Sequence, residues 1–95
     1  MRWDAKTDLD QSELAQAARA WGASVQLLHR VGQGCPDLLI GYTSKNGKRV
    51  NLLVEVKTMD GDLNERQREW HEGWRGQVAV VRSISQLEKL LLSVE

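Results

Sequence analysis

The sequence predicts an α/β domain in which helices flank a mixed sheet, with elements in the order α-β-β-β-α-β-α. Three observations lead to this fold class. Apolar residues recur with helical spacing in three segments, which begin near Asp10, Asn64 and Ser85. Four short runs rich in valine, leucine, isoleucine and alanine have the composition of strands. A short turn containing Gly47 joins the second and third runs, so these two strands should pair antiparallel.

The first helix is predicted to begin after Asp10, because an aspartate N-cap with Glu13 three residues later forms a capping box. Its buried face is expected to carry Leu14, Ala17, Ala18 and Trp21. Gly22 suits the left-handed position that ends a helix. The first strand is then predicted over residues 24–28.

The second strand is predicted over residues 37–42 and the third over residues 49–57. Because side chains alternate between the faces of a strand, Glu55 and Lys57 share one face. The intervening valines and leucines share the other face and belong to the main core. An ionised side chain inside an apolar strand is costly unless it is paired or bound to metal. These charged residues are therefore expected to be paired or to bind a metal ion.

The turn between these strands decides whether Asp37 meets Glu55. A two-residue turn over 46–47 would place Asp37 opposite a residue of the other face. A three-residue turn over 45–47 places Asp37 directly across from Glu55, and Gly47 supplies the positive φ that such a turn needs at its end. We therefore predict an odd-length turn or a bulge.

The second helix is predicted to begin after Asn64, with Gln67 at the capping-box position. Its inward-facing stripe is expected to carry Leu63, Gln67, Trp70 and Trp74. The fourth strand, over residues 77–82, is almost entirely valine and alanine and is expected to be buried on both faces. Ser85 is predicted to cap the last helix, with Glu88 at the box position. The stripe of this helix is expected to carry Leu87, Leu90, Leu91 and Val94.

Asp37, Glu55 and Lys57 form the candidate site. Two adjacent carboxylates repel each other, and bound Mg²⁺ or Mn²⁺ relieves that repulsion. Such a cation would activate a water and neutralise charge on a phosphate, while Lys57 would hold the attacking water or a phosphate oxygen. The carbonyl of Val56 is a candidate further ligand. The pattern indicates phosphodiester cleavage; on the residues alone, the alternative is a turn acid followed by an exposed surface pair.

Composition narrows the class of protein. Thirteen acids balance thirteen bases in 95 residues, so DNA would have to bind a local basic patch. The single cysteine, Cys35, excludes an internal disulfide framework and suits a reducing cytosol, so we expect a cytoplasmic protein. No apolar run approaches a membrane span, and we expect no signal peptide.

Four features together resemble the PD-(D/E)xK nuclease superfamily, and in detail its VRR-NUC (virus-type replication-repair nuclease) group, which is related to archaeal Holliday-junction resolvases. They are Glu13 on the first helix, the glycine-led Pro-Asp segment over 34–38, Glu55-Val56-Lys57, and Gln67 on the following helix. The resemblance covers nearly the whole chain.

The resemblance implies a restriction-endonuclease-like α-β-β-β-α-β core with a C-terminal helix, forming a single domain over residues 1–95. It implies metal-dependent, structure-selective cleavage of branched DNA such as four-way junctions, often by a homodimer when the domain stands alone. The chain resembles the stand-alone phage-type members, which would place it in the host cytoplasm. Two other functions stay open: a DNA-binding module on the same fold that does not cut, and a protein-interaction domain whose acidic face is only solvated.

The resemblance also implies roles for individual residues. Asp37 and Glu55 match the metal carboxylates, Lys57 matches the catalytic lysine, and Gln67 matches the glutamine that supports the site. Glu13 matches the helix-one acid that binds metal.

Two of these matches have a structural alternative, because the same residues occupy capping positions. Glu13 could serve only to cap the first helix with Asp10. Gln67 could serve only to cap the second helix with Asn64, although its place on the inward stripe favours the site.

Other residues carry weaker expectations. Arg30 is a candidate phosphate contact or a solvated loop residue, and Gln33, between two glycines, is a candidate contact to the DNA backbone. Cys35 is expected to be a small buried filler. His71 is expected to be exposed. Trp3 is expected to pack at a dimer contact or against the first helix.

Overall fold

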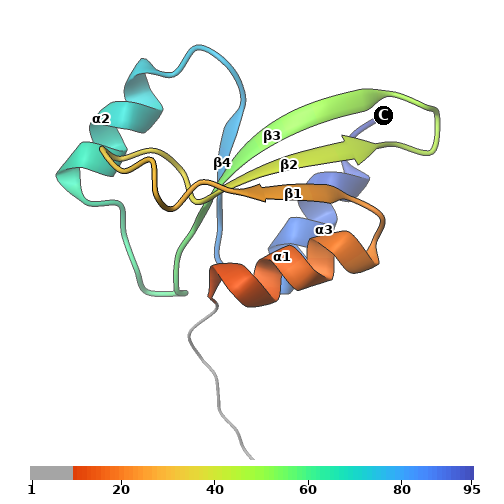
Figure 1. Ribbon diagram of the computed structural model, residues 1–95, viewed down its shortest axis with the longest axis horizontal. Helices are drawn as coiled ribbons and strands as arrows, with labels where there is room; N and C mark the ends of the chain where they lie inside the picture. The colour runs from red at the N-terminus through yellow and green to blue at the C-terminus, as the bar shows by residue number, and fades with distance from the viewer. Residues whose placement is uncertain (1–9) are drawn as a thin grey trace, which may run out of the picture.

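The fold is a mixed four-stranded sheet with three helices, as predicted (Figure 1). The computed structural model describes residues 10–95, so the expectation for Trp3 lies outside the described residues. The elements are α1 (Gln11–Ala20), β1 (Ser24–Leu27), β2 (Leu38–Thr43), β3 (Arg49–Val56), α2 (Glu65–Gly73), β4 (Val78–Val81) and α3 (Ile84–Leu92). Among residues 10–95, no helix has the length and apolar character needed to cross a membrane.

The sheet has the strand order β1-β2-β3-β4. β1, β2 and β3 pair antiparallel with their sequence neighbours, whereas β4 pairs parallel with β3. A parallel pair needs a crossover connection, and here the crossover contains α2. This topology carries the chain from the end of β3 out to α2 and back into the sheet.

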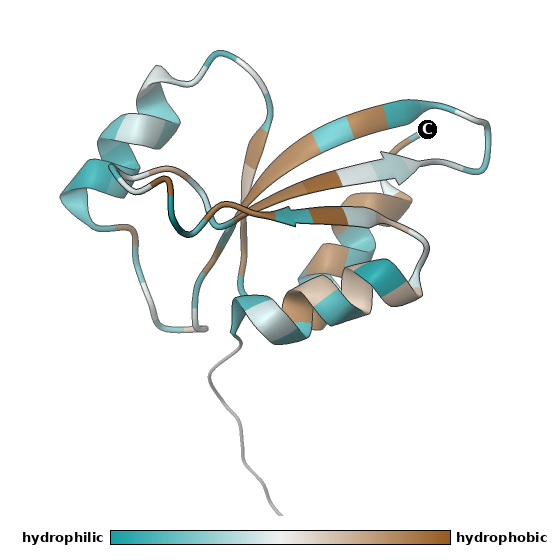
Figure 2. Ribbon diagram, in the orientation of Figure 1, coloured by the Kyte–Doolittle hydropathy of each residue, from teal (hydrophilic) through white to brown (hydrophobic). Residues whose placement is uncertain are grey.

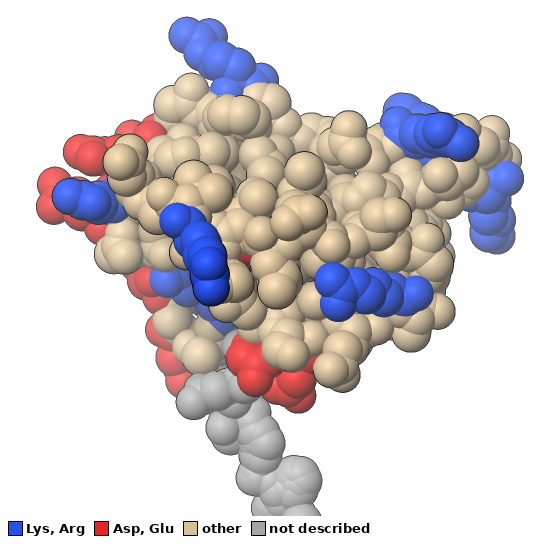
Figure 3. Space-filling view, in the orientation of Figure 1, with Lys and Arg blue, Asp and Glu red and all other residues tan. Residues whose placement is uncertain are grey.

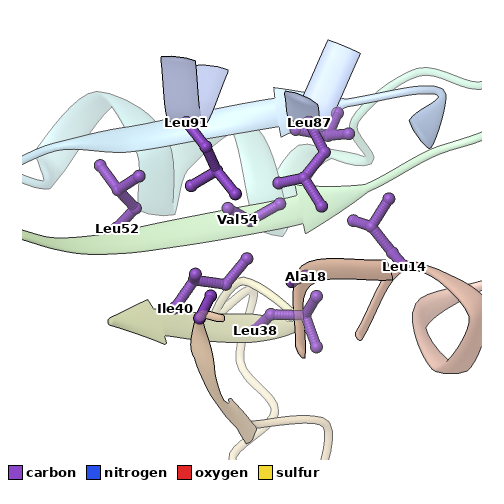
Figure 4. Close-up of a cluster of buried hydrophobic side chains, with 10 residues drawn as sticks. Leu14, Ala18, Leu38, Ile40, Leu52, Val54, Leu87 and Leu91 are labelled. Carbon is purple, nitrogen blue, oxygen red and sulfur yellow. The ribbon is translucent and has the colours of Figure 1, made fainter. Parts of the chain in front are cut away.

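The hydrophobic core lies between the sheet and two helices, α1 and α3, which contact each other on one face (Figures 1 and 4). Alternate residues of β2 and β3 point into it because of the two-residue period of a strand. The buried apolar residues of this cluster are Leu14, Ala18, Ala23, Leu38, Ile40, Leu52, Val54, Val81, Leu87 and Leu91. Burial of this kind contributes about 1.5–3 kcal/mol for each large aliphatic side chain.

α1 begins and ends where the sequence predicts. The Asp10 carboxylate accepts a 2.8 Å hydrogen bond from the backbone N–H of Glu13. Gly22 has φ +92°, and the N–H of Ala23 donates to the carbonyl of Ala18, which closes a Schellman motif. The expectation that Trp21 is buried is wrong: it is the C-cap residue and is 38% exposed.

α2 stands apart from the core at one end of the sheet and is mostly hydrophilic (Figures 1 and 2). The capping box of Asn64 and Gln67 forms as predicted. The expectation that Trp70 and Trp74 lie on a core stripe is wrong, because no residue of α2 is fully buried. Instead the two indole rings stack on each other, with centroids 4.6 Å apart, and Trp74 is 45% exposed.

The C-terminal third differs from prediction in two places. Ser83, not Ser85, is the N-cap of α3, and its hydroxyl accepts from the N–H of Gln86. The helix therefore begins two residues earlier, because both serines are suitable caps and only packing decides between them. β4 is fully buried only at Val81, whereas Val78 and its next two neighbours are half-buried. The expected burial on both faces is wrong because α1 and α3 cover one face only.

Candidate active site

The β2–β3 hairpin places Asp37 beside Glu55 in the predicted register. Leu38 pairs with Val54 and every further pair of the two strands keeps that register. The turn is closed by the N–H of Ser44, which donates to the carbonyl of Lys48 at 2.8 Å. Three residues lie between them, and the last, Gly47, has φ +85°. The predicted three-residue turn is therefore confirmed.

The side chain of Asp37 is fixed by the backbone of the opposite strand. Its Oδ2 accepts a 2.8 Å hydrogen bond from the N–H of Val56. Its own carbonyl accepts from the N–H of Leu28, which ties the residue to β1 as well. One carboxylate is thus held at the point where β1 and β3 end and β2 begins.

Glu55 is a buried acid, only 1% exposed, on the sheet face opposite α1 and α3. Burial is the main cause that raises the pKa of Glu55 to about 8, followed by the hydrogen bond with Asp37 and the charge of Asp37, while Lys57 lowers it. With a pKa of about 8, the acid is mostly protonated at neutral pH when no cation is bound. Its Oε1 has no hydrogen-bond partner within residues 10–95.

Gln67 serves both of the roles that its sequence position suggested. Its Oε1 accepts from the N–H of Asn64 at 3.0 Å, which completes the cap of α2. Its Nε2 donates to Oε2 of Glu55 at 3.2 Å. Capping orients the amide, and the orientation delivers the donor to the carboxylate. The same side-chain amide therefore caps α2 and binds the carboxylate of the site.

His71 belongs to this site, and the expectation that it is exposed is wrong. Its side chain is 13% exposed, and its Nε2 lies 3.7 Å from Oε1 of Glu55. Burial, and then the charge of Lys57, lower the pKa of His71. The signal that could have found it is spacing: residues four apart share a helix face, and His71 follows Gln67 by four.

Lys57 directly follows β3 and is half-buried. Its N–H donates to the carbonyl of Val81 at 3.0 Å, so β4 holds the backbone at this point. Arg82 then anchors the next segment by donating to the carbonyls of Thr58 and Gly61. The charge of Lys57 lowers the pKa of both Glu55 and His71, so the ammonium favours the ionised carboxylate and the neutral imidazole.

The loop before Asp37 packs tightly against α2. Gly32, Gln33 and Gly34 have φ values of +73°, +58° and +85°, a left-handed run that is unusual for a residue with a side chain. A Cβ on Gly34 would lie 2.4 Å from the carbonyl oxygen of Arg66. Backbone strain of this kind concentrates at functional sites. The loop therefore locks the first turn of α2 over the carboxylate pair.

We expect Gly34→Ala to destabilise the protein by more than about 2 kcal/mol, because it combines a positive φ with a clash against backbone. A methyl group that meets a carbonyl oxygen cannot be relieved by a rotamer change. Thermal unfolding would measure the loss, and Gly73→Ala is the matched control because a Cβ there meets nothing within 4 Å. Equal melting temperatures for the two variants would contradict the tight loop–helix contact.

The other residues proposed for the site lie around this loop. Arg30 is exposed in the turn after β1. Gln33 lines an open cavity of about 460 Å³ together with Arg66, Glu69 and Trp70. Cys35 is half-buried, and burial, followed by the charges of Glu55 and Asp37, raises the pKa of its thiol. The expectation of a fully buried filler at Cys35 is therefore met only in part.

Glu13 is an exposed residue in the first turn of α1. Its backbone N–H donates a hydrogen bond to the carboxylate of Asp10. Among the described residues, no three His, Cys, Asp or Glu side chains are close enough to hold a metal ion together. Glu13 is therefore not a third carboxylate of the Asp37–Glu55 pair in this arrangement, and its role as a ligand stays a prediction.

The residues present fit a divalent cation. Oε1 of Glu55 is a buried carboxylate oxygen that lacks a partner in the described part of the chain, and Mg²⁺ prefers oxygen ligands from one or two carboxylates. Asp37, Glu55 and the carbonyl of Val56 would hold the ion. A cation would replace the proton that Glu55 now carries.

The raised pKa of Glu55 predicts how the metal-free protein responds to pH. An acid whose pKa is raised in the folded state contributes full stability below its ordinary pKa and loses that contribution as pH rises through the folded pKa. The free energy of unfolding should therefore fall between pH 4.5 and about 8. The loss is on the order of 1 kcal/mol per pH unit. His71, whose pKa is lowered, acts in the opposite direction only below about 6.5. Melting temperatures between pH 6.5 and 8.5 in a chelator would test this.

Glu55→Gln is the control for that experiment, because the amide cannot ionise. Its melting temperature should be nearly flat over the same pH range, and saturating Mg²⁺ should flatten the wild-type curve. An equally steep curve for the variant would place the titrating group elsewhere.

A mixed sheet with a carboxylate pair and a lysine at the end of one hairpin defines a nuclease of the PD-(D/E)xK class, whose domains generally use divalent metals. The family model of the VRR-NUC domain matches residues 1–84. The chain therefore belongs to the VRR-NUC family and is a nuclease, a hydrolase that acts on DNA. No curated protein and no solved structure matches the chain.

Proposed function

We propose that this protein is a Mg²⁺- or Mn²⁺-dependent endodeoxyribonuclease that selects branched DNA, with four-way junctions as its preferred class of substrate. The observation that carries the proposal is the buried Glu55 carboxyl against Asp37, with one oxygen that lacks a partner in the described residues. A buried acid beside a second acid is costly, and a metal-dependent reaction explains why this arrangement is kept. The phage-type origin and the cytoplasmic location belong to the same proposal.

Each residue of the site has a role in this reaction. When bound, a divalent cation supplies Lewis-acid polarisation of the phosphate and a more acidic water. Asp37, Glu55 and the Val56 carbonyl hold it, and Gln67 fixes Oε2 of Glu55 at 3.2 Å. Lys57 orients the attacking water or a phosphate oxygen. Hydrolysis adds this water across one P–O ester bond and leaves a phosphomonoester and an alcohol.

DNA contacts would come from Lys and Arg side chains that lie apart from one another, because the chain has no net charge. Figure 3 shows Lys and Arg side chains separated by neutral residues on one face, with acids toward its edges. Arg30 and Gln33 are the proposed contacts on the loop that precedes Asp37. Gln33 shares its cavity with Arg66, so an amide and a guanidinium lie at the rim of the same depression.

We also propose a homodimer, since a four-way junction offers two symmetric strands to a two-fold enzyme. The sheet face opposite α1 and α3 supports it. Leu39, Leu53 and Val78 are adjacent across three strands on this face and are half-buried. α1 and α3 pack on the other side. A second copy would complete the burial of these side chains.

Sedimentation at high micromolar concentration tests the dimer. Leu53→Glu should shift the protein to a monomer, whereas Leu92→Glu, on an α3 residue that is 67% exposed, should not. A wild-type protein that stays monomeric with and without DNA would remove this part of the proposal.

The cleavage experiment uses labelled four-way junction, flap, single-strand and duplex DNA of matched sequence. We expect cleavage with Mg²⁺ or Mn²⁺, none in a chelator, and a preference for the junction. Equal cleavage of the plain duplex would contradict structure selectivity. Tight binding in Ca²⁺ with no cleavage in any metal would instead identify a DNA-binding module that does not cut.

A further inference from the structure

We propose that His71 is a positioning residue of the carboxylate site, whose ring N–H holds Oε1 of Glu55 while Gln67 holds Oε2. The two side chains would grip one carboxylate from a single helix face. This inference deepens the proposed function and rests on it, since it concerns the acid that would bind the cation.

The geometry carries the proposal. Nε2 of His71 and Oε1 of Glu55 lie 3.7 Å apart. Both atoms are buried, and neither has a hydrogen-bond partner within residues 10–95. A buried donor and a buried acceptor without partners are each costly, by about 1–3 kcal/mol. A hydrogen bond between these two atoms would satisfy the donor and the acceptor at the same time.

The framework around His71 directs its ring at this acid. His71 lies one helical turn after Gln67, which already donates to Oε2 of Glu55 at 3.2 Å. The ring of Trp70 meets the imidazole edge-on, with centroids 6.0 Å apart and planes at 70°. Gly34 packs against the backbone of Arg66 and fixes the start of the same helix. The start of the helix is therefore fixed, and the imidazole packs against a neighbouring ring.

The present 3.7 Å separation exceeds an ordinary N–H···O distance of about 2.7–3.2 Å. An ionised carboxylate accepts shorter and stronger hydrogen bonds. A cation binds the ionised form of the Glu55 carboxyl, and that form would draw the ring in and close the contact.

A neutral imidazole suits this task better than a charged one. The side chain of His71 is 13% exposed, and burial disfavours the charged form of an imidazole. A neutral N–H holds the carboxylate without adding a second positive charge next to the cation and Lys57. The carboxylate oxygen has room for both partners, because an ionised carboxylate has about four acceptor sites.

Two other roles for His71 compete with the positioning role. His71 could ligate the cation itself, or it could only fill space beside Trp70. Replacement by glutamine, by leucine and by alanine separates them. Glutamine keeps an N–H donor, leucine keeps much of the volume without a donor, and alanine removes both.

The test measures Mn²⁺ affinity by calorimetry, together with melting temperature in a chelator and cleavage kinetics on a junction. We expect His71→Leu to weaken Mn²⁺ binding about tenfold or more, the usual effect of removing a hydrogen bond to a metal ligand. His71→Gln should recover most of the affinity. Excess Mn²⁺ should restore kcat in His71→Leu. Glu72→Gln, an exposed neighbour on α2, is the matched control and should behave as wild type.

Each outcome separates the possibilities. Mn²⁺ affinity that is the same in wild type, His71→Leu and His71→Ala would overturn the proposal and leave His71 as a packing residue. Affinity lost equally in the leucine and glutamine variants would also overturn it, and would make the imidazole itself a ligand. If His71→Leu binds Mn²⁺ more weakly than wild type but the wild type cuts no DNA, the positioning role holds and the proposed function fails. A wild type that binds no Mn²⁺ would defeat both.

Discussion

Asp37→Asn is expected to reduce DNA cleavage by roughly a thousandfold or more, because a cation site would lose one of its two carboxylates. The metal is worth several kcal/mol of charge stabilisation in such reactions, which corresponds to a loss of this size. Cleavage of a labelled junction under single-turnover conditions in saturating Mg²⁺ measures the effect. Calorimetry with Mn²⁺ should show weaker binding in parallel.

The same substitution should leave the fold intact. An asparagine oxygen can still accept the hydrogen bond from the N–H of Val56. The variant also removes the charge that helps to raise the pKa of Glu55, so the metal-free protein should be equally or more stable. Full activity in Asp37→Asn would contradict the metal assignment. Loss of activity with a strongly lowered melting temperature would show that the acid is structural.

Lys57→Ala is expected to lower the cleavage rate by about 10²–10³-fold while metal affinity is retained. Its proposed work is on the water and the phosphate, so only steps that involve those groups should suffer. Metal affinity should, if anything, rise slightly, because an ammonium next to the carboxylates is removed. Calorimetry and single-turnover kinetics on the same samples separate the two effects.

Lys89→Ala is the control for this prediction, since Lys89 is exposed on α3 and its removal changes the net charge equally. Its cleavage rate should stay near that of wild type. If Mn²⁺ affinity disappeared together with activity in Lys57→Ala, the lysine would have a structural role instead.

The carboxylate geometry could be predicted from the sequence because a strand has a period of two residues. A single-residue slip moves a side chain to the other face, so requiring Asp37 to face Glu55 selected the length of the turn. Gly47 confirmed that choice through its positive φ. The caps at Asp10 and Asn64 were also predictable, because capping is a local interaction.

The tryptophans could not be placed in the same way, and the spacing of His71 from Gln67 shows only that the two residues share a helix face. Helical periodicity says which residues share a face, but it does not say what that face meets. α2 turns its stripe toward Glu55 and the loop before Asp37, so Trp70 and Trp74 cover each other instead of the core. His71 lies beside that stripe and reaches the acid. Only the tertiary path of the crossover decides this.

Parallel pairing of β3 with β4 imposes an order on folding. β1, β2 and β3 are joined by local connections and can form a meander early, whereas β4 joins only after a longer loop has closed. α2 lies within that late-closing loop. We therefore expect the two acids to become neighbours before the transition state for folding is passed, and Gln67 and His71 to reach them afterwards. A cation present during refolding would meet a pair of ligands before the helix covers them.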